Sequence, residues 1–327
     1  MIHLTPSCPA EHAAGQYAQN IARAARCAAL AAVSLMLAGC QPAVLDPAGP
    51  VGRAQLSIFV DSLAIMLAIV VPTMIGTLAC AWWFRRGNAR AQRLPYWSYS
   101  GRIEMVTWGV PLLTIMLLGG VAWVGAHELD PGRSLPGDKP LEIQAVSLDW
   151  KWLFIYPEQG VASLNEVAVP AGKPVHFLLT SGSVMNAFFV PQLGSMIYTM
   201  NGMVSELHLQ ADHEGTFGGL SSHYSGDGFS DMHFAVRSLD GDGFARWIAA
   251  AHADAAGLDA ASYAQLARQS TKDPARQWGR VDPELFDKIV SQHLPPGPGP
   301  KPTTGGKSGS AKAEGGPGTS IRMAKEH

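Results

Sequence analysis

Three apolar segments occupy the first part of the chain, and they differ in length and in their neighbours. Residues 27–39 follow two arginines and are too few to cross a bilayer. Residues 56–84 contain one charged residue, Asp61, and residues 105–126 contain none. Each of these two longer segments can form a tilted transmembrane helix. The pattern therefore predicts two membrane-spanning helices, and we assign no role to Asp61.

After Pro136 the apolar residues alternate with polar ones in short runs that turn-forming residues separate. Strands of about five residues at such spacing are typical of an antiparallel β-sandwich. Trp150, Trp152, Phe154 and Tyr156 alternate with a period of two, which predicts that they pack on one face of a strand. The predicted strands include residues 141–146, 175–179, 205–209 and 232–236.

The pattern changes again beyond Gly243. Residues 244–252 and 260–270 have helical spacing and belong to a segment rich in aromatic side chains. From Leu294 onward Pro, Gly, Ser and Lys dominate without periodicity, which predicts a disordered tail.

The first apolar segment has the order of an export signal: basic residues, a short apolar stretch, then small residues. It ends in Leu37-Ala38-Gly39-Cys40, which resembles the lipobox of bacterial lipoproteins. The resemblance implies cleavage before Cys40 and acylation of that cysteine. The simpler alternative is a cysteine that follows a signal peptide by chance.

The loop between the two predicted spans contains five arginines from Arg85 to Arg102 and no acidic residue. Such a loop is expected on the cytoplasmic side of the membrane. Two spans then place both the N-terminal segment and everything after His127 on the outer side. The export signal predicts the same topology independently.

Composition excludes several kinds of function. The 327 residues are 47% hydrophobic and 15% charged, and the formal net charge is −2 without a long basic run, so nucleic-acid binding is not expected. The four cysteines all precede the predicted β-domain, which can therefore hold neither a disulfide nor a thiolate-bound copper. They are Cys8, Cys27, Cys40 and Cys80.

Residues 221–232 have the spacing of a copper site but lack its ligands. The segment resembles the C-x-E-x-C-x-x-x-H-x-x-M motif, which holds the dinuclear copper centre in subunit II of cytochrome c oxidases. A serine hydroxyl cannot replace a thiolate bridge, because its proton is lost only at very high pH. In this alignment Ser221 and Ser225 stand at the two cysteines, His223 at the glutamate, Phe229 at the histidine and Met232 at the methionine, and Asn186 stands at the motif's upstream histidine.

This combination resembles subunit II of the bo-type ubiquinol oxidases, which take electrons from quinol in the membrane. The match runs from about residue 40 to about residue 294 and includes two spans and the lipobox. Its most specific segments are WSxSxxxExxxWxxP at 97–111, DWKWxFIYPEQG at 149–160, VMNxFFxP at 184–191 and YSGxGFS at 224–230.

The resemblance implies a two-helix transmembrane hairpin, a cupredoxin-like β-sandwich and a short helical extension. It implies a non-catalytic subunit of a proton-pumping complex in the bacterial inner membrane, which oxidises ubiquinol and reduces oxygen to water. This chain would bind no cofactor and no cytochrome c, since haems and copper would belong to a partner, subunit I, with subunits III and IV completing the complex. The predicted parts are a signal peptide (1–39), an outer segment (40–54), the hairpin (55–127), the periplasmic domain (128–242), the aromatic-rich extension (243–293) and the tail (294–327).

Two alternatives belong to other classes of protein. A cytochrome c oxidase subunit with a degenerate copper site is disfavoured, because no cysteine follows Cys80. A free-standing lipoprotein with a cupredoxin-like fold, acting in binding or assembly, would not need two spans in addition to a lipid anchor.

Glu104 is the acidic residue for which the sequence suggests two roles, one in helix stability and one in proton transfer. It opens the second span at its cytoplasmic end, where a carboxylate stabilises a helix N-terminus. In the family that it resembles, a glutamate at this position lies at the mouth of a proton pathway into subunit I. The two interpretations are compatible.

Histidines and methionines of the β-domain suggest no further site. His208, His213, His223 and His233 lack the close spacing of a metal-ligand pair, so no metal site is expected. A loose group of Met196, Met200 and Met203 is predicted to fill gaps in the core.

Overall fold

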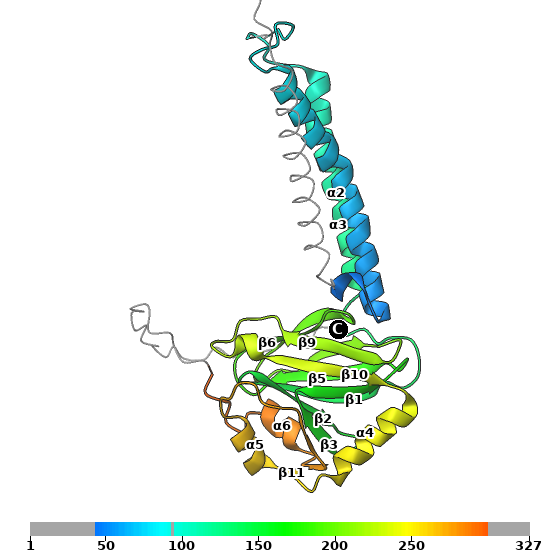
Figure 1. The fold of residues 1–327 in the computed structure, drawn as a ribbon, viewed down its shortest axis with the longest axis vertical. Helices are drawn as coiled ribbons and strands as arrows, with labels where there is room; N and C mark the ends of the chain where they lie inside the picture. Colours follow the sequence, from blue (N-terminus) through cyan, green and yellow to red (C-terminus); the bar gives the residue numbers. More distant parts are fainter. Residues whose placement is uncertain (1–42, 93–94, 300–327) are drawn as a thin grey trace, which may run out of the picture.

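The computed structural model describes residues 43–92 and 95–299. A helical hairpin stands at one end of a β-domain, and a C-terminal extension covers the far side of that domain (Figure 1). The predicted signal peptide, Cys40 and the tail beyond residue 299 lie outside the described residues.

The hairpin consists of α2 (Pro50–Trp83) and α3 (Gly101–Glu128), which follow the short turn η1 (Ala43–Leu45). Both helices are long and apolar enough to cross a membrane, and almost none of their side chains is buried. They pack closely near their outer ends, where Gly125 leaves room for the side chain of Ile58. The two predicted spans lie within these helices, except that Phe84 lies one residue beyond the end of α2.

The β-domain is a sandwich of two sheets, with a small third pair of strands in the extension. Sheet A has the order β12-β3-β2-β1-β5-β8, and sheet B has the order β4-β10-β9-β6-β7. The strands of sheet A are β1 (Leu141–Leu148), β2 (Lys151–Tyr156), β3 (Val161–Leu164), β5 (Val175–Ser181), β8 (Ser205–Leu209) and β12 (Arg276–Trp278). Those of sheet B are β4 (Glu166–Pro170), β6 (Asn186–Val190), β7 (Gly194–Thr199), β9 (Gly215–Ser221) and β10 (His233–Leu239).

Strand directions differ in part from the prediction. Most neighbours are antiparallel, but β1 pairs with β5 and β4 pairs with β10 in parallel. The predicted β-sandwich is confirmed, and only the direction of these two strand pairs differs from the antiparallel expectation. Alternation of apolar residues locates a strand and its faces, and it does not determine the direction of the neighbouring strand.

Sheet A is covered on both faces. Trp152, Phe154 and Tyr156 face sheet B and join a core that includes Phe188 and Phe234. The intervening residues of β2 are also buried, and two of them pack against the extension. Strand β2 is buried along its whole length because sheet A lies between sheet B and the extension.

The extension contains α4 (Gly241–Ala253), α5 (Ala260–Leu266) and α6 (Leu285–Val290), joined by the short strands β11 (Gly257–Leu258) and β13 (Arg280–Val281). The side chain of Asp240 accepts a hydrogen bond from the amide of Gly243 at 2.7 Å and so caps α4. Asp259 and Ser262 form a capping box on α5. The aromatic residues that distinguish this segment are buried: Trp247, Tyr263, Trp278 and Phe286.

Candidate functional site

The segments that match the copper motif meet at one end of sheet B. Asn186 begins β6 and Ser221 ends β9, and these antiparallel neighbours bring Phe188 opposite Ser221. The Ser221 hydroxyl lies 3.1 Å from the Asn186 Oδ1 atom, to which it donates a hydrogen bond. The fold thus brings together the positions of the upstream histidine and the first cysteine.

The other motif positions surround this pair. Ser225 and Met232 are buried, and the hydroxyl of Ser225 has no hydrogen-bond partner. Phe229 packs against the ring of Tyr224, with a centroid distance of 5.6 Å. His223 lies beside the Tyr198 ring at 5.8 Å, outside the buried group. Hydrophobic and aromatic packing therefore surrounds the place that a metal would occupy.

These residues do not fit a dinuclear copper centre. The buried donors are two hydroxyls, one amide and one thioether, the imidazole of His223 lies outside this group, and the amide oxygen is already hydrogen-bonded to Ser221. Bridged copper requires two thiolates, and the one cysteine in the described ranges, Cys80, lies in a membrane-spanning helix. Among residues 43–92 and 95–299, no group of three or more His, Cys, Asp or Glu side chains could hold a metal ion.

Trp150 closes the motif loop from the side. Its indole nitrogen donates to the Ser225 carbonyl at 3.0 Å, and its ring lies so close to Gly228 that an added Cβ would be 2.4 Å from it. Trp150 has a positive φ of 66°, because it occupies the tight turn between β1 and β2. Trp150 therefore lies outside β2, but its side chain packs against the same core as Trp152, as the alternation predicts.

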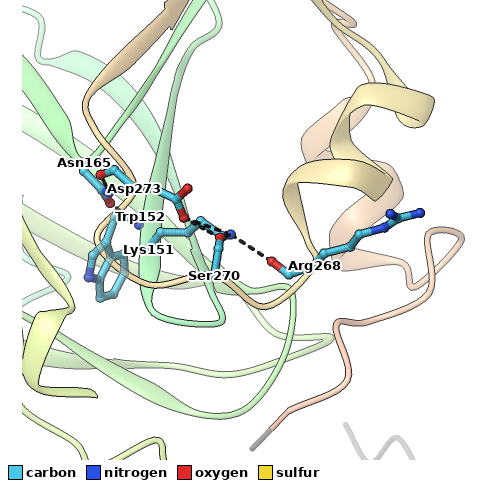
Figure 2. Close-up of polar contacts among 6 residues, drawn as sticks. All are labelled: Lys151, Trp152, Asn165, Arg268, Ser270 and Asp273. Carbon is cyan, nitrogen blue, oxygen red and sulfur yellow. Dashed lines mark hydrogen bonds and ion pairs between the residues drawn. The ribbon is translucent and has the colours of Figure 1, made fainter. Parts of the chain in front are cut away.

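A buried lysine follows directly in the sequence (Figure 2). Lys151 is 2% exposed, and its ammonium donates to the Arg268 carbonyl at 2.8 Å, to the Ser270 hydroxyl and to the Asp273 carboxylate at 3.2 Å. Burial lowers the pKa of Lys151, and the carboxylate of Asp273 acts in the opposite direction. All three partners belong to the loop after α5, so this contact fixes the extension to β2.

Two neighbouring side chains strengthen the same junction. Asn165 donates to the Asp273 carbonyl at 2.9 Å and accepts from the Trp152 amide at 2.9 Å, as Figure 2 shows. Asp149 accepts from the Ser183 hydroxyl at 2.5 Å and from the Gly299 amide at 3.1 Å. Sequence reasoning missed this network, although a lysine inside an apolar strand pattern was an available signal.

Two methionines predicted to fill the core are instead on the surface. Met196 is 42% exposed and Met203 is 53% exposed, so that prediction is wrong for both. Met196 lies on β7, an edge strand, where side chains of one face lack a covering layer. With their exposed apolar neighbours they form a surface that we call the Met–Tyr patch: Met185, Met196, Tyr198, Met203, Val204 and Tyr224.

The Met–Tyr patch lies near the outer end of the hairpin. The start of the strand that carries Met196 and Tyr198 is attached to the start of α2 through three hydrogen bonds, one of them from the Ser195 amide to the Gln55 side-chain oxygen at 3.2 Å. The Gly52 amide donates to the Leu193 carbonyl at 3.1 Å, and the Gln55 side chain donates to the Ser195 hydroxyl at 3.2 Å. The patch is thus held at the side of the domain that is nearest the membrane.

Glu104 lies at the opposite end of the hairpin. It occupies the first turn of α3, its amide donates to the Ser100 carbonyl at 3.0 Å, and its side chain is exposed. Ser100 precedes the helix but makes no capping bond with its side chain. A carboxylate in this turn is therefore well placed to stabilise the helix N-terminus.

Two family models match the chain. The model described as "Cytochrome C oxidase subunit II, periplasmic domain" matches residues 157–239, and "COX Aromatic Rich Motif" matches residues 252–297. The solved periplasmic domain of cytochrome oxidase subunit II from Bradyrhizobium japonicum is 26% identical, covers 36% of this chain and 96% of its own, and has a TM-score of 0.34.

Curated relatives match most of the chain. "Cytochrome bo(3) ubiquinol oxidase subunit 2" of Pseudomonas aeruginosa is 46% identical over 80% of each chain. "Ubiquinol oxidase subunit 2" of Acetobacter aceti is 44% identical over 84% of this chain and 89% of its own. "Quinol oxidase subunit 2" of Bacillus cereus is 36% identical over 72% and 82%. The chain therefore belongs to the family of ubiquinol oxidase subunits 2, which are parts of an oxidoreductase complex.

The Lys151 network gives a direct prediction about stability. Lys151→Met leaves the Asp273 carboxylate without its cation, so we expect a loss of about 3–5 kcal/mol in the free energy of unfolding. Hydrogen exchange of residues 268–273 should increase at the same time. Denaturant unfolding of the full chain in detergent measures the first effect.

Lys139→Met is the matched control, because Lys139 pairs with Glu158 at 2.7 Å on the exposed surface. We expect little change in the free energy of unfolding for that variant, because water screens an exposed ion pair. Equal effects of the two substitutions would show that the buried ammonium does not anchor the extension.

Proposed function

We propose that this chain is the non-catalytic subunit II of a proton-pumping ubiquinol oxidase, which oxidises ubiquinol and reduces oxygen to water. One observation carries the proposal: the residues at the copper-motif positions meet in space but lack the donors that copper needs. Without that centre the domain has no means of accepting electrons from cytochrome c. Quinol within the membrane is then the electron source, as the names of the relatives indicate.

This subunit carries no cofactor in the proposed complex. Haems and catalytic copper belong to the partner, subunit I, and subunits III and IV complete the assembly. The role of the β-domain is to cap the outer face of subunit I. The exposed apolar side chains of the Met–Tyr patch support this role, because large exposed apolar side chains that gather on one surface are usually covered by a partner.

The proposed location is the bacterial inner membrane, with the β-domain in the periplasm. The two apolar helices and the arginine-rich loop between them support this topology. An acylated Cys40 would add a lipid anchor next to the start of α2. The two spans also disfavour a free-standing lipoprotein module, since one anchor suffices for tethering.

The choice of electron donor tests the proposed function. The purified complex that contains this chain should consume oxygen rapidly with ubiquinol and not with reduced cytochrome c. A cytochrome c oxidase complex, assayed in the same detergent with both donors, is the control. Comparable rates with the two donors would contradict the proposal.

Restoring the copper ligands tests the motif alignment. The fivefold variant Asn186→His, Ser221→Cys, His223→Glu, Ser225→Cys and Phe229→His should bind copper, because Met232 is already in place and the segments already meet. The parent chain should bind none tightly. Metal analysis and near-infrared absorbance after copper loading distinguish the two proteins. A folded, colourless variant would argue against the alignment.

We further propose that Glu104 gathers protons at the cytoplasmic face for a pathway in subunit I. Its exposed position in the first turn of α3, beside the arginine-rich loop, supports this role. A carboxylate can load a proton from water and pass it inward.

Removal of this carboxylate should slow proton uptake. We expect Glu104→Ala to lower oxidase turnover severalfold with haem content unchanged, and Glu104→Asp to retain more activity. A role limited to the helix dipole predicts a stability loss of about 0.3–1 kcal/mol with normal turnover per assembled complex. Normal turnover of the Ala variant across pH would therefore remove the proton-uptake proposal.

A further inference from the structure

Two histidines lie face to face at the edge of sheet A, beside the linker that joins α3 to the β-domain. His176 on β5 and His208 on β8 are direct partners in the antiparallel register. Their ring centroids are 4.3 Å apart, and the ring planes differ by 7°. His208 is 8% exposed, so one member of the pair is almost fully buried.

The histidine pair holds the linker in place. The His208 amide donates to the Pro131 carbonyl at 3.0 Å, and the His208 Nδ1 atom lies 3.4 Å from the same oxygen. Within the described part of the chain, no other backbone hydrogen bond joins residues 129–140 to the sheets. The linker therefore depends on a single backbone contact, and a titratable ring lies directly at that contact.

Charged groups face the pair from several elements. Glu206 on β8 lies 3.4 Å from the His176 Nε2 atom, which is buried and has no hydrogen-bond partner. Glu142 on β1 is the parallel neighbour of His176. On the linker side, a cavity of about 420 Å³ is lined by His208 together with Glu128, Asp130 and Arg133.

Protonation of His208 is unfavourable in the folded protein. Burial lowers the pKa of His208 below its ordinary value of 6.5, and His176 adds to this effect, while the Pro131 carbonyl and Glu206 oppose it. A released His208 binds its proton more readily than a docked one. The contact is therefore complete above about pH 6.5 and weakens as the pH falls through the lowered pKa.

We propose that the His176–His208 pair is a pH-sensitive contact that holds the linker on sheet A at neutral pH and releases it when the outer solution acidifies. Two positively charged rings at the observed separation would repel each other. The start of α2 is attached through Gly52 and Gln55, neither of which titrates near neutral pH. Acidification would therefore loosen the domain from α3 while α2 keeps its attachment.

Hydrogen exchange of the intact oxidase complex tests this proposal. The peptide that contains the His208 amide should lose protection severalfold between about pH 7.5 and about pH 5.5, after correction for intrinsic exchange. His208→Gln should keep similar protection at both values, because glutamine does not titrate. His176→Gln should reduce the pH dependence. His233→Gln, an exposed histidine on sheet B, is the matched control and should behave like the parent.

Glu206→Gln provides a directional test that a merely structural role would not satisfy. Because the Glu206 carboxylate favours the protonated form of His208 in the docked state, its removal should make the loss of protection at about pH 5.5 larger than in the parent. This variant also decides the outcome if His208→Gln does not fold. Equal protection of the parent at the two pH values, or an unchanged loss of protection in Glu206→Gln, would overturn the proposal.

Discussion

The arrangement of the β-domain depends on the buried ammonium of Lys151. A buried charge at the start of an apolar strand is stable only when protein groups replace its water, and here a carbonyl, a hydroxyl and a carboxylate do so. All of them come from the loop after α5, more than a hundred residues further along the chain. Strand β2 and the extension must therefore be in place together.

The turn between β1 and β2 also supports the motif loop, residues 221–232. Asp149 contacts the end of the extension, Trp150 contacts the motif loop, and Lys151 contacts the loop after α5. In a copper protein, metal–ligand bonds would restrain the motif loop. Here three contacts restrain the loop instead. They are the hydrogen bond between Asn186 and Ser221, the contact of the Trp150 indole, and the hydrogen bond from the Ser221 amide to the Met232 carbonyl at 3.2 Å. Each such hydrogen bond contributes about 0.5–1.5 kcal/mol, so several are needed.

Local patterns in the sequence predicted what depends on local structure. The two helices, the strand near residue 205 and the helix after Gly243 follow from the period of their apolar residues. The parallel pairs and the Lys151 network could not be predicted in this way, because they depend on segments far apart in sequence. The methionines were misplaced for a related reason: a flexible apolar side chain suits both a core and a surface that meets a partner. The meeting of Asn186 and Ser221 was accessible only through the motif alignment.

The segments on either side of the hairpin also close the open side of the sandwich. Ala48 donates to the Gln192 carbonyl at 2.7 Å and accepts from the Asp212 amide at 2.9 Å, so it joins the end of sheet B to the end of sheet A. The Pro131 carbonyl accepts a hydrogen bond from the His208 amide on the edge strand β8. Unpaired strand edges promote association with other chains. The segments beside the hairpin therefore cover part of the β-domain as well as connecting it to the membrane, and a domain cut free at Glu128 would lose the Ala48 bridge.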